Sequence, residues 1–377
     1  MFGKRIKLFK LFGFSVNIDL SWLILAVLIT WSLADGLFPY YFKGFSTGTY
    51  WWMGIAGAAG LFISIIFHEF CHSIVARKFN MQMKGITLFI FGGVAEMESD
   101  PQSPSAEFLM AVAGPVSSIF LGVVFYLIFI AGRNIGWSKP LNGVLEYLMI
   151  INFVLAGFNL IPAFPLDGGR VLRSILWGIK KNLQWATHIA SYIGSAFGIF
   201  LIIFGVFNFI TGNFVGGIWF LLIGLFIRSA SNMSYKRLLM QNTLGGEEIQ
   251  RFMKTDPVTV SPSISVEQLV NDYFYKYHYK MFPVTNGDGL MGCITSKQVR
   301  ELPKEEWERH TVKDIMIHCS DENVISPTTD ALQALAIMNR TGNSRLMIVD
   351  NNHLLGIVTL KDMLKFFNIK IDLETNK

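Results

Sequence analysis

The chain of 377 residues is 52% hydrophobic and only 16% charged, and it contains 33 phenylalanines. This composition exceeds the apolar content of an ordinary soluble domain and indicates an integral membrane protein. The net charge of +5 does not indicate nucleic-acid binding, because the lysines and arginines form short clusters beside apolar runs and not one basic face. The three cysteines are scattered and lack CxxC spacing, so they indicate neither a disulfide framework nor a cysteine-based zinc site.

The first segment, residues 1–14, is basic and amphipathic and suits a membrane surface. A signal peptide is the alternative, but the apolar run at 20–37 is long enough to span a bilayer and lacks a convincing cleavage site. Asp19 stands before that run as a simple helix N-cap. Five more runs follow, at 50–75, 106–131, 141–177 with a break, 188–210 and 214–230.

The distribution of lysine and arginine orients these six spans. Most of the cations near span ends lie on the N-terminal side, whereas the other side has only Lys43, Arg133 and Lys139. Six spans place both termini on one side. We therefore expect a multi-pass protein of the cell membrane with both termini in the cytoplasm.

The second run carries the sequence HEFCH at residues 68–72. On a helix, His68 and His72 lie on the same face with Glu69 beside them. Zinc binds imidazole nitrogens, and a neighbouring carboxylate can deprotonate a zinc-bound water. Because ionisable residues are costly within a membrane, the pattern predicts a zinc-hydrolase site. We expect Cys71 to have only a small, buried, apolar role.

The fourth run contains NLIPAFPLDGGR at residues 159–170, and its prolines and glycines must interrupt a helix. Irregular backbone at membrane depth is tolerated where it lines a cavity or a site. Asp167 lies in this break, on the cytoplasmic half of the membrane like His68, and is the favoured third zinc ligand. The open alternatives are Glu96 or Glu98 as that ligand, and an Asp167 that only caps the following helix or pairs with Arg170 or Arg173.

Residues 81–100 are rich in strand-forming side chains and are too short to cross the membrane. This composition predicts strands near the membrane, whose free edge could pair with an extended peptide. The alternative is an ordinary cytoplasmic loop.

Together, HEFCH and NLIPAFPLDGGR resemble the site-2 protease family of intramembrane zinc metalloproteases, which is peptidase M50-like, in its prokaryotic type with C-terminal tandem CBS domains. The resemblance covers essentially the whole chain. It implies one Zn²⁺ per chain held by His68, His72 and Asp167, with Glu69 as general base and acid and Asn159 near the substrate carbonyl. It also implies that Gly114-Pro115 helps to shape the site and that the substrate is a transmembrane protein, whose helix must unwind before cleavage.

From Ile249 the chain becomes typical of a soluble α/β fold and contains a repeat. Val260-Ser261-Pro262 recurs as Ile325-Ser326-Pro327 at an offset of 65, and the segment 292–295 recurs as 356–359 at an offset of 64. We expect the extra residue to lie in a hairpin loop. The two copies resemble a tandem of CBS modules.

Such a pair implies a regulatory adenine nucleotide, ATP, ADP or AMP, bound through Thr359, Asp362 and Thr295. The first repeat has Gln298 where the second has Asp362, so the two half-sites should be unequal. The alternative is that the pair serves only dimerisation or docking.

The sequence therefore predicts an α-helical multi-pass membrane domain with six spans, one of them broken, and a short membrane-associated β segment, followed by an α/β CBS pair. The expected boundaries are 1–232 for the membrane domain, 233–248 for a linker, and 249–308 and 309–370 for the CBS domains. The expected function is intramembrane proteolysis within the lipid bilayer, with a homodimer formed through the CBS domains and no nucleic acid. Two rivals are a CBS-regulated metal or ion transporter, in which His68, Glu69, His72 and Asp167 form a permeation site, and a catalytically silent scaffold. The presence of Glu69 in an HExxH pattern argues against both, because cation transport does not require that order of residues.

Overall fold

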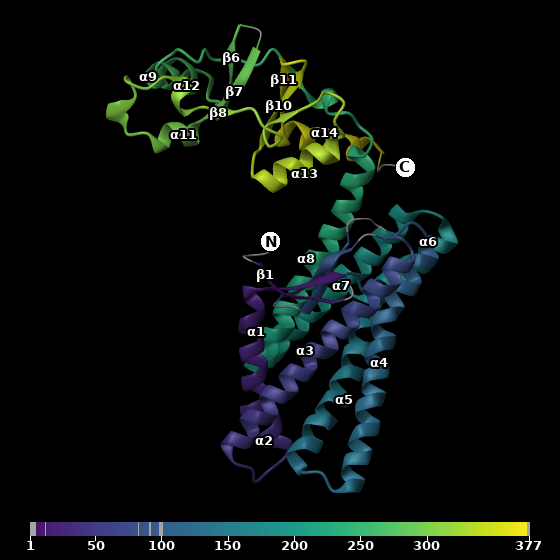
Figure 1. The fold of residues 1–377 in the computed structure, drawn as a ribbon. Coiled ribbons are helices and arrows are strands. Elements are labelled where there is room, and N and C mark those ends of the chain that lie inside the picture. The colour runs from purple at the N-terminus through teal and green to yellow at the C-terminus, as the bar shows by residue number, and fades with distance from the viewer. Residues whose placement is uncertain are drawn as a thin grey trace. The chain divides into compact units, whose positions relative to one another are not determined.

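The computed structural model describes residues 5–11, 13–81, 83–89, 92–97, 101–287 and 289–374 (Figure 1). The chain forms two compact units, Met1–Lys236 and Arg237–Lys377. Six helices among the described residues are long and apolar enough to cross a membrane, as the sequence predicted. They span Leu20–Tyr41, Thr47–Lys78, Pro104–Ile135, Lys139–Asn159, Leu183–Ile210 and Phe214–Leu244.

The first three membrane spans begin at side-chain caps that the sequence supplies. Asp19 accepts the Ser21 N–H at the start of α1 (Leu20–Trp31), which confirms its predicted capping role. The first span continues through a π-helical turn, Ser32–Leu37, into α2 (Phe38–Tyr41). The next two spans, α3 (Thr47–Lys78) and α4 (Pro104–Ile135), begin at serine caps.

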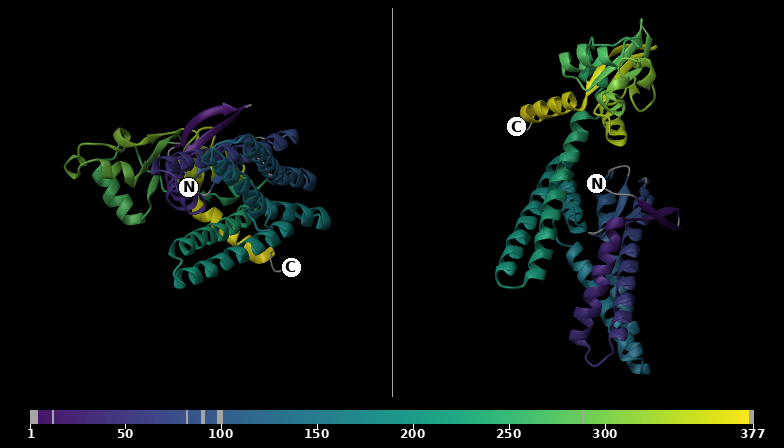
Figure 2. Two further views of the ribbon diagram at one scale, coloured as in Figure 1. Left: turned by 90° about the horizontal axis from the view of Figure 1, so that it is seen from below. Right: turned by 90° about the vertical axis from the view of Figure 1, so that its left-hand side faces the viewer.

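The fourth apolar run is broken as predicted, into α5 (Lys139–Asn159) and α6 (Asp167–Lys180). Glycines allow the irregular segment to pack against α6, because a Cβ on Gly169 would lie 2.3 Å from the Phe164 nitrogen. The last two spans, α7 (Leu183–Ile210) and α8 (Phe214–Leu244), form a hairpin (Figure 2). Gly205 on α7 faces Gly217 on α8 so closely that neither has room for a side chain.

A four-stranded sheet lies where the first span begins and the second ends. Its strands are β1 (Arg5–Leu11), β2 (Phe14–Asp19), β3 (Met83–Phe89) and β4 (Gly92–Met97), in the order β1-β2-β3-β4. The β3–β4 hairpin was expected, but β1 and β2 were not, because residues 1–14 were interpreted only as a surface segment. The buried side chains of Val16, Ile18 and Ile86 show why the N-terminal residues pair with β3.

The segment expected to be a linker is largely helical, since α8 runs to Leu244. It contains no glycine or proline before Gly245-Gly246, and Gly246 has a φ of 76°, so the helix ends where the sequence first permits a left-handed residue. Leu244 is fully buried in a core with Ile249 and Leu346. The polar composition of the segment concealed this apolar stripe.

The second unit contains a seven-stranded sheet with the main order β6-β7-β11-β10-β9. Two antiparallel hairpins form its centre, β6 (Met281–Asn286) with β7 (Gly289–Thr295), and β10 (Arg345–Asp350) with β11 (His353–Thr359). The short strands are β5 (Lys254–Thr255), β8 (Ile317–His318) and β9 (Val324–Ile325). The helices are α9 (Val266–Leu269), α10 (Tyr275–Tyr277), α11 (Ser296–Glu301), α12 (Val312–Ile315), α13 (Ala331–Thr341) and α14 (Leu360–Glu374), with short 3-10 turns at Ile249–Phe252 and Lys304–Glu306.

The extra residue of the first repeat lies in its helix and not in the hairpin loop, which corrects the expectation from sequence. The helices begin 65 residues apart, at Val266 and Ala331, but end at left-handed residues 64 apart, His278 and Gly342. Between those points the first repeat has a π-helical turn, Val270–Phe274. A π turn accommodates one inserted residue without breaking the helix, so β6 and β10 correspond at an offset of 64.

Candidate metal centre

The predicted zinc ligands converge in the first unit. His68 and His72 lie on α3, and Asp167 is the first residue of α6. Asp167 Oδ2 lies 3.0 Å from His68 Nε2 and 3.2 Å from His72 Nε2, and the two nitrogens are 3.1 Å apart. Ligands about 2.0 Å from a tetrahedral zinc ion lie about 3.3 Å from one another. The three atoms therefore match one face of a zinc coordination tetrahedron and leave a fourth position.

Helix α4 orients both imidazoles through contacts with their Nδ1 atoms, on the side of each ring away from Asp167. His72 Nδ1 lies 2.6 Å from the Met110 carbonyl oxygen, and because a carbonyl can only accept, Nδ1 is the donor. The lone pair of neutral His72 is then on Nε2, which faces the other two atoms. His68 Nδ1 lies 2.9 Å from the hydroxyl of Ser118. Outer hydrogen bonds of this kind fix the tautomer and direction of metal-binding histidines.

Gly114 explains how α4 approaches so closely. A Cβ at this position would lie 2.1 Å from His72 Nε2 and 2.5 Å from His68 Nε2. No side chain other than hydrogen is compatible with the observed positions of the imidazoles. Gly114 and Ser118 are four residues apart and therefore share one face of α4.

Asp167 contacts the histidines and not an arginine. Arg173, one of the two predicted alternative partners, instead donates from Nε to Glu107 Oε1 at 2.7 Å and forms a buried ion pair with it. Glu107 is fully buried on α4, and the Arg173 guanidinium also lies over the Phe164 ring, 5.1 Å from its centroid. The ion pair thus connects α4 to the helix that presents Asp167.

Glu69 is half-buried beside the histidines, and within the described part of the chain its carboxylate has no hydrogen-bonding partner. Asn159 is the half-buried last residue of α5, where the fourth run breaks. Cys71 is a half-buried free thiol outside the triad. The alternative ligands are not tested, because Glu98 and the side chain of Glu96 lie outside the described residues.

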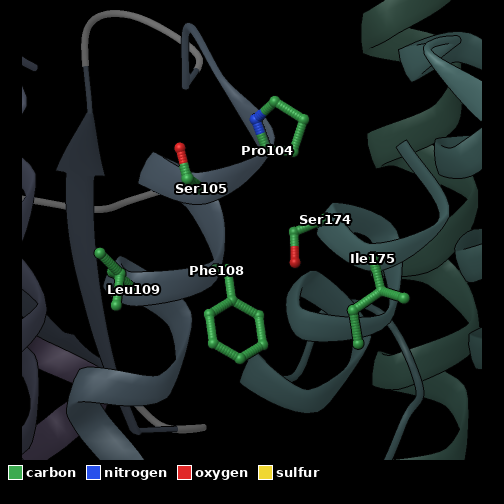
Figure 3. Close-up of a pocket in the computed structure, with 6 residues that line it drawn as sticks. All are labelled: Pro104, Ser105, Phe108, Leu109, Ser174 and Ile175. Atoms are coloured by element: carbon green, nitrogen blue, oxygen red, sulfur yellow. The ribbon is translucent and has the colours of Figure 1, made fainter. Parts of the chain in front are cut away.

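Two pockets lie away from the triad. Figure 3 shows one of about 410 Å³ between α4 and α6, where Phe108, Leu109 and Ile175 give an apolar lining. None of the predicted site residues lines it.

The other pocket, of about 880 Å³, lies beside β11 and the start of α14 in the second unit. Thr359 and Asp362 line it, but Thr295 does not. The Thr359 hydroxyl lies 2.6 Å from Asp362 Oδ2, and Lys254 Nζ lies 3.2 Å from Asp362 Oδ1. Sequence reasoning missed Lys254, which reaches the pocket because β5 pairs with β11.

The corresponding residues of the first repeat cap a helix. Thr295 and Gln298 form a capping box at the start of α11, in which the Thr295 hydroxyl donates to the Gln298 side chain. At the start of α14 the Thr359 hydroxyl likewise donates to Asp362 and accepts the Asp362 N–H. Capping therefore accounts for both pairs, and the adjoining pocket distinguishes the second.

Comparison with known proteins covers both units. Residues 56–138 and 134–203 match Peptidase family M50, and residues 247–305 and 312–369 match the CBS domain. A Mycobacterium tuberculosis protein named as a zinc metalloprotease, Rip3, is 31% identical over 97% of this chain and 93% of its own length. The zinc metalloprotease MJ0392 of Methanocaldococcus jannaschii is 29% identical over 97% and 96%. The solved site-2 protease of Methanocaldococcus jannaschii is 28% identical and covers 62% of this chain and 95% of its own, with a TM-score of 0.43.

Proposed function

Since the chain belongs to peptidase family M50 and is an intramembrane zinc metalloprotease with a CBS pair, we propose that His68, His72 and Asp167 hold one Zn²⁺ per chain. The observation that carries this assignment is the convergence of their three ligand atoms within 3.2 Å of one another. Three electron-rich atoms at such distances, on two buried histidines and a half-buried aspartate, require a cation or a proton between them.

The reaction is hydrolysis of a peptide bond in or near a transmembrane segment of a membrane protein. Zinc bound at the triad would supply a Lewis acid that polarises the scissile carbonyl and brings the pKa of water to about 7. Glu69 takes the proton from the attacking water and returns it to the leaving amine. Asn159, at the end of α5, donates to the carbonyl oxygen as negative charge develops there.

The substrate helix must unwind before this chemistry, because its carbonyl groups are otherwise bonded within the helix. The broken segment between α5 and α6 provides irregular backbone at the same depth as the triad, since Asp167 ends it. We propose that an unwound substrate segment enters beside this break.

The rival function is a cation transporter that uses the side chains of His68, Glu69, His72 and Asp167. The Glu69→Gln variant separates the two, because proteolysis needs a base whereas cation passage does not need a base beside the ligands. Purified protein should cleave a single-pass reporter and the variant should not. Full cleavage by the variant, or ion flux into proteoliposomes that depends on His68 and Asp167, would overturn the protease assignment.

We further propose that both termini face the cytoplasm and that residues 249–308 and 309–370 are two cytoplasmic CBS domains after a membrane domain of residues 1–232 and a connecting segment, 233–248. The excess of lysine and arginine on the N-terminal side of the spans supports this orientation. Reporter enzymes fused at either terminus would test it. The CBS pair is also the surface proposed for a homodimer, which light scattering of the purified protein would detect.

An adenine nucleotide is the proposed regulator at the pocket beside α14. The pocket volume of about 880 Å³ suits a ligand of that size, and Asp362, which lines the pocket, is the residue proposed to accept from ribose hydroxyls. Asp362→Ala should weaken binding of nucleotide to the full-length protein far more than Gln298→Ala, by calorimetry. Unchanged substrate cleavage on saturation with nucleotide would contradict a regulatory role.

A further inference from the structure

The pocket beside α14 is strongly basic. Four cationic side chains line it, Lys254, Arg345, Lys361 and Lys365, and among the described residues that line it Asp362 is the only acid. Asp362 is paired with Lys254, whose side chain is 70% exposed, so this ion pair is weak and can yield to a ligand. The pocket therefore has more positive charge than its own carboxylate can balance.

The other three cations are available. Within the part of the chain that the structure describes, no carboxylate forms an ion pair with Arg345, Lys361 or Lys365. Among the described residues, the Arg345 side chain donates only to the neighbouring Ser344 hydroxyl, at 3.2 Å. Like charges gathered without counter-charges repel one another, and a polyanion removes that repulsion.

The first repeat provides an internal comparison. At the offset of 64 that the strands establish, Arg345, Lys361 and Lys365 correspond to Met281, Lys297 and Glu301. One cation is thus replaced by an apolar side chain and another by an acid. None of the three first-repeat residues lines the pocket. The concentration of positive charge is specific to the second repeat.

We propose that this pocket selects its nucleotide by phosphate charge and takes a nucleoside triphosphate in preference to a monophosphate. The inference rests on the proposed nucleotide regulation and adds that the second unit distinguishes nucleotides by their number of phosphate groups. Lys361 and Lys365, on the first two turns of α14, make the selection together with Arg345. The ion pair between Lys254 and Asp362 opens when nucleotide binds. Asp362 then accepts from the ribose hydroxyls, and Lys254 binds phosphate together with the other cations. The second unit then responds to the supply of triphosphate and not to the total of adenine nucleotides.

Calorimetry of the full-length protein in detergent tests this, with ATP and AMP as magnesium-free sodium salts. At low ionic strength, ATP should bind at least about tenfold more tightly than AMP, because each additional charge-assisted contact favours the triphosphate. The ratio of ATP affinity to AMP affinity should decrease as the salt concentration is raised. The Lys361→Ala/Lys365→Ala variant should lose most of the ratio while its AMP affinity stays within about threefold.

The matched control is Lys297→Ala, the corresponding lysine of the first repeat, which should leave both affinities unchanged. Equal binding of ATP and AMP would overturn the proposed selection for triphosphate, and so would an affinity ratio that is unchanged in the double variant. Either result would leave nucleotide regulation itself in place. If neither nucleotide binds at millimolar concentration to a protein that still cleaves its reporter, both the nucleotide site and its selectivity are wrong, and the protease assignment is untouched.

Discussion

At the scale of single residues, the proposed metal site depends as much on an absent side chain as on its proposed ligands. Gly114 lies where α4 comes closest to both Nε2 atoms, and a Cβ at this position would overlap them. Ser118 and the Met110 carbonyl oxygen hold the far side of the two rings. The ligand positions are therefore defined by three helices, α3, α4 and α6.

Gly114→Ala should abolish zinc binding, because a methyl group 2.1 Å from His72 Nε2 forces that ring away from Asp167. Gly157→Ala on α5 is the control, because among the described residues no atom beyond its own stretch of helix lies within 4 Å of its added Cβ. Metal analysis of both purified variants would check the prediction. A Gly114→Ala protein with one zinc per chain would show that α4 does not confine the site.

Ser118→Ala should weaken zinc binding about 10- to 100-fold, the usual effect of losing a partner of a ligating histidine. Ser117→Ala is the control, since the Ser117 hydroxyl donates to the Gly114 carbonyl oxygen and not to a histidine. Competition with a chelator would measure both affinities. Equal losses in the two variants would contradict an orienting role for Ser118.

The thiols of the second unit should differ in reactivity with pH. Burial raises the pKa of Cys293 to about 11, and burial also raises the pKa of Cys319, which is nevertheless exposed. Since the thiolate is the reactive form, alkylation of Cys293 should be slow at pH 8 and accelerate toward pH 11. Mass spectrometry after timed alkylation should find Cys319 modified first, and unfolding in urea should remove the difference. Rapid modification of native Cys293 at pH 8 would be inconsistent with its burial.

At the scale of elements, the buried Glu107–Arg173 pair joins α4 to α6. Removing one partner leaves a buried charge and should cost about 3–5 kcal/mol, whereas replacing both with apolar residues should cost much less. Thermal unfolding in detergent of Glu107→Leu, Arg173→Leu and the double variant would measure this. If the double variant is the least stable of the three, the pair is not coupled in this way.

The membrane helices were predictable because apolar length is a strong local signal, and the break at 160–166 because its prolines cannot continue a helix. Strands β1 and β2 were not predictable, because β2 pairs with β3, which lies far along the chain, and the basic residues of 5–10 obscured the alternation in 14–19. The helical connection to Leu244 and the π turn at Val270–Phe274 were missed for a related reason, since tertiary packing decides both.

The histidine pair and Asp167 were predicted from chemistry and spacing, but Ser118 and Lys254 were not. Each belongs to an element that carries no chemical motif and reaches its site only through packing or strand pairing. Glu69 and Asn159 have no contact within the described residues that would test their roles. Their assignment follows from family membership together with position.

At the scale of the whole molecule, the chain contains a membrane unit with a proposed metal site and a second unit with a basic pocket. We propose that His68, His72 and Asp167 hold one zinc ion, with Glu69 as base and not ligand. Zinc content per chain, measured on the purified wild type and on variants of these four residues, tests this most directly. We predict one zinc in the wild type and in Glu69→Gln, and a large loss in His68→Ala, His72→Ala and Asp167→Asn. Full zinc in Asp167→Asn, with loss in Glu96→Gln or Glu98→Gln, would contradict the claim.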